Sequence, residues 1–341
     1  MKTVTILLAI VGLLLGTALV GYFGFGEVWH ALLAVRWTGF LAIVLYHLAG
    51  IALLGLCWYV LSPRPAPLRA FVWGRLIRDS GSELLPLSQL GGFVMGARAA
   101  MLLGIGGAAA TASTIVDVTL EVVGQLGYTA LGLALLARLK PDDPLIGWIA
   151  LGILAGLAAV ASFIAVQRHA LGRMENLVRR IAQRWSRSAA EEQQPLFLEI
   201  HEIYRRPGAL YLGGLLHWAA WVASSVEAWL ALHLMGAPLG IGAVIVIESL
   251  LYAIRSVAFA VPNAVGVQEG AYIMLGAAFG LTPETALALS LLKRARDLVI
   301  GVPALIAWQV LESRRLLTGL GRPAAMPSFT PAGGKAEGAD T

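Results

Sequence analysis

The chain has 341 residues, of which 58% are hydrophobic and only 13% are charged, and its formal net charge is +5. The apolar residues form runs of about 20, the length that crosses a bilayer, and the basic residues gather between these runs, which excludes a soluble enzyme or a nucleic-acid-binding domain. The single cysteine, Cys57, excludes an intramolecular disulfide and a cysteine-based metal site. We therefore expect an all-α, multi-pass membrane protein.

The first two apolar runs predict two membrane spans. Residues 3–25 follow Lys2 and predict a retained signal anchor, because no small-x-small cleavage site precedes Gly21. A second span is expected over residues 38–61. The following segment, residues 62–80, carries four arginines and a single acid, so the positive-inside rule places it in the cytoplasm. Two crossings precede it, and the N-terminus is therefore expected in the cytoplasm as well.

The next apolar stretch, residues 84–106, is broken by four residues that do not suit a simple span: Pro86, Gly91, Gly92 and Arg98. Two uninterrupted spans follow, at residues 111–136 and 145–166. The insert 167–207 then carries eight arginines and is expected in the cytoplasm, as a basic amphipathic helix on the membrane surface or as a solvated loop helix. If the broken stretch crossed fully, this insert would face outward, so we predict a re-entrant hairpin on the cytoplasmic side.

A second break lies in the C-terminal third of the chain. A span at residues 209–235 precedes two apolar pieces, which are separated by Pro262, Asn263 and Gly266. A last span is expected over residues 284–311, and the Gly, Pro and Ala-rich residues 316–341 are expected to be a disordered cytoplasmic tail. The arginines 314 and 315 lie in the cytoplasm only if the second broken segment is a hairpin entered from outside. The two hairpins are therefore expected to point in opposite directions.

An ungapped shift of 176 residues supports an internal repeat, because it aligns Ser80 with Ser256, Pro86 with Pro262, Gly104 with Gly280 and Glu121 with Asp297. Sequence identity is weak, so the positions of the breaks and charges carry the argument. We predict an inverted repeat with halves at about 38–136 and 209–311. The whole prediction is a transmembrane domain over residues 1–315, with about six full spans, two oppositely oriented re-entrant hairpins and both termini in the cytoplasm.

Charged residues inside the apolar runs are the candidate site, because each unpaired charge at a helix centre costs roughly 2.5–3.5 kcal/mol on insertion scales. Asp117 and Glu121 lie four residues apart on one predicted span. The last span carries Lys293, Arg294, Arg296 and Asp297. We hypothesise that the two acids meet these cations across the pseudo-two-fold axis and form a substrate pathway. The alternative is a static network of structural ion pairs.

Further candidates flank the two breaks. Glu269 follows Gly266 by three residues, where a helix is expected to begin, so it could cap that helix or contact a substrate. Near the first break, Glu83, Arg78 and Arg98 are similarly placed, and the two arginines could hold a lipid phosphate or extend to the interface. The single histidines in apolar spans predict helix–helix hydrogen bonds rather than metal ligands: His47, His217 and His233. No cofactor or metal site is expected.

Two motifs resemble a known family. The segment from Pro262 to Pro303, which includes Glu269, the triplet FGL and the sequence LLKRARDL, resembles the C-terminal motif of the lysylphosphatidylglycerol synthetase transmembrane (flippase-like) family. LLPLSQLGG followed by GIGGAAATAS is similar to its first motif. The resemblance covers roughly residues 5–315, and the chain length and ARDL ending resemble the hopanoid-biosynthesis-associated, HpnL-type branch. The family often has a lone arginine where this chain has three basic residues.

The resemblance implies a flippase-like lipid transporter of the bacterial inner membrane. It would move a hopanoid or another polar-headgroup lipid between leaflets or toward the outer membrane, with membrane lipids and lipid-biosynthesis enzymes as candidate partners. The alternatives are an intramembrane enzyme that modifies a lipid headgroup, with Glu269 or Glu121 as general base, and a noncatalytic partner of hopanoid biosynthesis. The sequence has no Ser-His-Asp pattern and no His-Glu-x-x-His motif, so transport is preferred and no catalytic residue is assigned.

Overall fold

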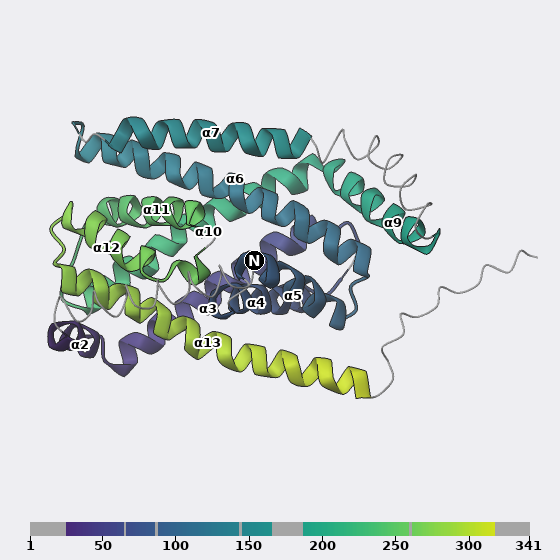
Figure 1. Ribbon diagram of the computed structural model, residues 1–341, viewed down its shortest axis with the longest axis horizontal. Helices are drawn as coiled ribbons and strands as arrows, with labels where there is room; N and C mark the ends of the chain where they lie inside the picture. The colour runs from purple at the N-terminus through teal and green to yellow at the C-terminus, as the bar shows by residue number, and fades with distance from the viewer. Residues whose placement is uncertain are drawn as a thin grey trace, which may run out of the picture.

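The computed structural model describes residues 25–64, 66–85, 88–142, 145–165, 187–258 and 261–317 (Figure 1). Within these residues it contains eleven α-helices, one short 3₁₀-helix and no strand, as the all-α prediction requires. Residues 3–24 of the expected first span, the expected arginine-rich helix of the insert and residues 318–341 of the expected tail lie outside the described residues, while residues 316 and 317 are the end of a helix. Pro86 also lies outside them.

Among the described residues, four helices are long and apolar enough to cross a membrane: α3 (Arg36–Leu61), α6 (Gly107–Leu139), α7 (Leu145–Ala165) and α10 (Pro207–Leu234). They coincide with four predicted spans and confirm the multi-pass membrane character of the chain. The last predicted span is also a helix, α13 (Pro283–Leu317), of 35 residues. Charged residues at its centre make it more polar than the other four. The short helix α2 (Phe25–Ala34) precedes α3 and packs against α13.

Each broken segment folds as a pair of packed helices. α4 (Leu68–Leu84) and α5 (Ser88–Leu102) flank the first break, while α11 (Ile241–Val257) and α12 (Val267–Ala277) flank the second. The second break contains the 3₁₀-helix η2 (Pro262–Ala264), in which Asn263 has a φ of 48°. Gly266 precedes α12 with a φ of 81°, a conformation that glycine adopts without the steric penalty of a Cβ. The chain thus stops being helical where the sequence predicted.

Gly91 and Gly92 do not belong to the first break, contrary to our prediction, because both lie inside α5. The reason is a close helix–helix contact. A Cβ added at Gly92 would lie 2.5 Å from the carbonyl oxygen of Arg78 and 2.9 Å from the backbone nitrogen of Ser82. Glycine is therefore required here so that α5 can approach the backbone of α4.

The helices of residues 36–139 and 207–317 occur in the same order. α3, α4, α5 and α6 correspond to α10, α11, α12 and α13, and under the 176-residue shift their ends agree to within about five residues. The hairpin α4–α5 lies toward the end of the molecule that carries α9 (Arg187–Tyr204), and α11–α12 lies toward the end where α13 begins (Figure 1).

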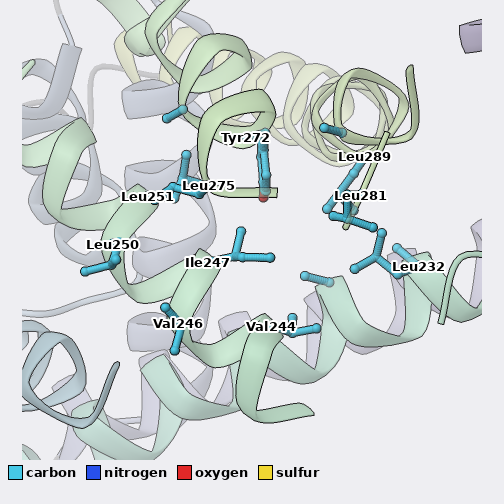
Figure 2. Close-up of a cluster of buried hydrophobic side chains, with 14 of the residues drawn as sticks. Leu232, Val244, Val246, Ile247, Leu250, Leu251, Tyr272, Leu275, Leu281 and Leu289 are labelled. Carbon is cyan, nitrogen blue, oxygen red and sulfur yellow. The ribbon is translucent and has the colours of Figure 1, made fainter. Parts of the chain in front are cut away.

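Apolar side chains form both the core of the second half and the outer surface. Ile247 and Leu251 of α11 face Tyr272 and Leu275 of α12, with Leu289 of α13 beside them (Figure 2). On the outside, large apolar side chains of α7, α10 and α13 are exposed, whereas many of the buried side chains are polar or charged. This distribution suits a surface in contact with lipid and a polar interior.

Candidate functional site

A cavity of about 260 Å³ lies in the interior, where α3, α4, α5, α6, α10, α11 and α13 each contribute to its wall. Four arginines line it: Arg75, Arg78, Arg255 and Arg296. Four acids line it as well: Asp79, Glu83, Glu121 and Asp297. Because helices from both halves of the chain form this wall, the cavity is the place where charged side chains of the two halves gather.

The first network joins α4 and α6 of the first half to α10 of the second half. Arg75 donates to Glu121 at 2.7 Å and Arg78 donates to Asp117 at 2.7 Å, while Arg78 also bonds to Glu121. The Oδ1 atom of Asp117 lies 2.9 Å from Nε2 of His217, and both side chains are fully buried. Residues three or four apart share a helix face, so the arginine pair of α4 meets the acid pair of α6 directly.

In the second half, Glu248 of α11 is the equivalent acceptor. It accepts hydrogen bonds from Nζ of Lys293 and from the hydroxyl of Tyr272, both at 2.6 Å, and Lys293 also donates to that hydroxyl at 2.9 Å. All three groups are buried. The charge order is the reverse of that in the first half, because here the acid lies on the hairpin helix and the cation on the long helix.

Glu269 caps the start of α12. Its carboxylate accepts from the backbone nitrogen of Gly266 at 2.7 Å, which makes it the N3 residue of a capping box, and from the hydroxyl of Ser290 at 2.8 Å. Arg294 donates its Nε to the same carboxylate at 2.7 Å. Of the two roles predicted for Glu269, the structure places it as a cap, and it does not line the cavity.

Further contacts join the halves, and two sets of them involve charged residues of the cavity wall. His47 of α3 lies 2.9 Å from Glu227 of α10, which also accepts from Arg296, and Arg296 donates to Asp297 at 2.6 Å. The second set joins the hairpins.

At the hairpin junction, Nη2 of Arg255, near the end of α11, donates to both carboxylate oxygens of Glu83, near the end of α4, at 2.9 and 3.0 Å. It also reaches Asn263 in η2 at 3.3 Å. The two breaks therefore meet at one ion pair beside the cavity.

The pairing that we predicted across the two halves is wrong. Asp117 and Glu121 do not contact Lys293, Arg294 or Arg296, because Arg75 and Arg78 of the preceding hairpin already neutralise them. Sequence reasoning placed both arginines in a polar segment between spans, and on α4 their side chains are buried.

Arg98 and Arg78 do not form one phosphate site. Arg98 of α5 donates to Glu312 of α13 at 2.6 Å, and neither Arg98 nor Glu312 lines the cavity, whereas Arg78 does. His47 and His217 make the predicted hydrogen bonds between helices, but His233 bonds to the carbonyl of Trp229 in its own helix at 2.8 Å.

Sequence reasoning did not assign a role to Asp79 or Arg255, although a signal was available. The 176-residue shift pairs Asp79 with Arg255 and Asp117 with Lys293. Equivalent positions of both halves thus carry charges of opposite sign, a pattern that a search for identical residues overlooks. In the part of the chain that the structure describes, no three His, Cys, Asp or Glu side chains are grouped to hold a metal ion.

A protein-family model described as "Lysylphosphatidylglycerol synthase TM region" matches residues 8–304 of the chain. No curated protein and no solved structure matches the chain.

Proposed function

The chain belongs to the lysylphosphatidylglycerol synthase TM region family, and from this premise we propose that it moves a lipid with a polar headgroup between the leaflets of a membrane. The observation that carries the proposal is the charged cavity formed by helices of both halves. A charged headgroup crosses hydrocarbon at a high cost, and a polar cavity at membrane depth lowers that cost.

The size of the cavity supports a path for a headgroup. Its volume of about 260 Å³ is below the ~300–1,000 Å³ of sites that enclose a drug-sized ligand. A whole lipid does not fit, so the apolar chains would remain in the bilayer while the headgroup occupies the cavity. The hairpins are proposed to enter from opposite faces, as in transporters with inverted repeats, so that each gives access from one side.

Within this proposal the charged residues have two roles. Those on the cavity wall, such as Arg78, Glu121 and Asp297, would face the headgroup. Those behind the wall would position them, as Asp117 positions Arg78 and as Glu269 holds the start of α12. We also propose, as the sequence predicted, that the transported lipid is a hopanoid or another lipid with a polar headgroup and that the protein lies in the bacterial inner membrane.

Lipid analysis of cells that lack the protein tests the proposal. We expect the transported lipid to be made in normal total amount but to accumulate in the inner leaflet or in the inner membrane, and wild-type protein should restore its distribution. Glu121→Gln should restore it poorly, because Arg75 and Arg78 would lose a shared carboxylate at the cavity wall. Arg98→Gln, which alters an ion pair away from the cavity, is the matched control and should restore it fully.

Other outcomes would favour the alternatives. If one lipid is absent and its precursor accumulates, the protein is an enzyme that modifies a headgroup. If lipid composition and distribution both stay normal while lipid-biosynthesis enzymes no longer assemble together, a noncatalytic partner is favoured. Either result would overturn transport.

A further inference from the structure

The cavity wall is balanced in formal charge, since four arginines face four acids. Behind the wall, Lys293 pairs with Glu248 and Arg294 pairs with Glu269. Two further acids, Asp117 and Glu227, each share a hydrogen bond with a histidine. The cavity wall is thus neutral in formal charge, and a ligand that brings a net charge to it would leave one charge without a counter-ion.

A polar ligand nevertheless needs charged partners, and one pair is placed to provide them. Glu83 and Arg255 are 30% and 19% exposed, whereas the side chains of Arg75, Arg78 and Arg296 are each 7% exposed or less. The Glu83–Arg255 pair is therefore the ion pair of the wall that a ligand in the cavity can best reach.

Arg255 also has unused donors. Among the described residues it bonds through Nη2 only, which leaves Nε and Nη1 without a protein acceptor, whereas Arg75 and Arg296 use all three guanidinium nitrogens. A planar guanidinium with a free edge binds a phosphate or another oxyanion in bidentate fashion.

Aromatic groups lie next to this pair. The guanidinium of Arg255 lies 5.7 Å from the centre of the Tyr252 ring, and Tyr252 packs edge-to-face against Trp221 with ring centres 4.7 Å apart. Both rings line the cavity. Trp and Tyr rings attract an ammonium group through their π electrons, so the cavity wall offers a cation aromatic partners in addition to its acids.

We propose that the Glu83–Arg255 pair binds a zwitterionic lipid headgroup, with the oxyanion on Arg255 and the ammonium group on Glu83. The inference rests on the proposed function and narrows its substrate class. A zwitterion separates the two side chains and gives each a new partner, so no charge is left unpaired. An anionic headgroup would leave Glu83 unpaired and a cationic headgroup would leave Arg255 unpaired.

The pair also connects ligand binding to the hairpins. Glu83 is one residue from the end of α4, and Arg255 contacts Asn263 in the second break. A headgroup between the two side chains would replace the direct contact between α4 and α11. Binding would therefore loosen the junction at which the two hairpins meet.

Binding of short-chain lipids to the purified full-length chain in an uncharged detergent tests the proposal. The probes are dihexanoyl phosphatidylethanolamine, which is zwitterionic, dihexanoyl phosphatidylglycerol, which is anionic, and a cationic ethylphosphocholine lipid of equal chain length. We expect the zwitterion to bind about tenfold or more tightly than either charged lipid, the ratio that ~1.4 kcal/mol produces. Glycerophosphoethanolamine, which has the headgroup without chains, should bind more weakly.

Variants of the pair should change the preference in opposite directions. Glu83→Gln leaves the wall with a net positive charge and should favour phosphatidylglycerol, whereas Arg255→Gln should favour the cationic lipid. If the pair had a purely structural role, each variant would weaken the binding of all three lipids to the same extent. The double variant Glu83→Gln with Arg255→Gln keeps the wall neutral and should bind without charge preference. Arg98→Gln, the control away from the cavity, should keep the wild-type preference.

The inference and the proposed function can fail separately. Transport is measured in vesicles that contain acyl-labelled forms of the same lipids. If the zwitterion binds preferentially but no lipid moves, transport is wrong and the binding site stands. The inference is overturned if charged lipids bind as well as the zwitterion, if the two single variants shift no preference, or if glycerophosphoethanolamine binds as tightly as the lipid.

Discussion

Buried charges in this protein are neutralised by neighbours on adjacent helices. Lys293 is held by Glu248 and Tyr272, and Arg78 is held by Asp117 and Glu121. The presence of Lys293, Asp117 and Glu121 inside apolar runs could be predicted from the sequence, and so could their need for partners, whereas Arg78 was expected in a polar segment between spans. The identity of the partners could not, because spacing along one helix does not fix the neighbour that its charged face meets.

The Lys293–Glu248 pair allows a test at this scale. Lys293→Met leaves the carboxylate of Glu248 buried with only the Tyr272 hydroxyl as partner, and loss of one member of a buried pair costs about 3–5 kcal/mol. We expect a clearly lower unfolding temperature of the purified protein in detergent. The double variant Lys293→Met with Glu248→Leu removes both charges and should recover most of the loss.

The Arg98–Glu312 pair provides the comparison, because both side chains are partly exposed, 38% for Arg98 and 17% for Glu312. Arg98→Gln should cost clearly less stability than Lys293→Met, because neither charge of this pair is fully buried. The Lys293–Glu248 pairing would be contradicted if Glu248→Leu did not raise the unfolding temperature of Lys293→Met. It would also be contradicted if a double variant that exchanges the charges of Glu121 and Arg294 were as stable as the wild type.

At the level of the helices, the sequence predicted more than it did for individual charges. Hydropathy and charge located α3, α6, α7 and α10, and proline and glycine located the second break. The role of Gly92 was misread, because a glycine in an apolar run can break a helix or permit close packing. Only the position of the neighbouring helix distinguishes these two roles.

The packing of the first hairpin predicts the effect of a single methyl group. In Gly92→Ala the new Cβ would meet the backbone of α4 at Arg78 and Ser82, and backbone cannot move aside as a flexible side chain can. Forcing extra atoms into a packed contact typically costs about 1–3 kcal/mol. We expect a lower unfolding temperature and weaker lipid binding, since Arg78 belongs to the cavity wall.

Gly214 is the matched control for this substitution. It lies within α10, and a Cβ added there would have no atom within 4 Å. Because alanine favours helix more than glycine does, Gly214→Ala should leave stability unchanged or raise it slightly. Equal losses from both substitutions would show that the hairpin contact at Gly92 has no special importance.

At the scale of the whole molecule, the order of the apolar segments in the two halves was more informative about the fold than the few identical residues. The order of broken and unbroken apolar segments predicted two matching sets of four helices, and the observed helix ends agree with the 176-residue shift. The cavity could not be predicted, because it depends on how seven helices from both halves meet. The proposed opposite orientation of the hairpins nevertheless makes a prediction about sidedness.

Four exposed positions distinguish the proposed arrangement from one in which each broken segment crosses the membrane. Arg64 precedes the first hairpin and Leu103 follows it, while Asp142 follows α6 and Thr282 follows the second hairpin. With re-entrant hairpins, cysteines introduced at Arg64 and Leu103 should react with a membrane-impermeant thiol reagent from the cytoplasmic side. Cysteines at Asp142 and Thr282 should react from the opposite side.

The chain is well suited to this measurement, since its single cysteine, Cys57, is fully buried and should contribute little background. If α4 and α5 crossed the membrane as one broken span, the cysteine at Leu103 would react from the side opposite to the one at Arg64. The cavity would then be reached differently from each leaflet. Reaction of both from one side, together with reaction of Thr282→Cys from the other, is the pattern that opposed hairpins require, because each hairpin then returns to the face from which it entered.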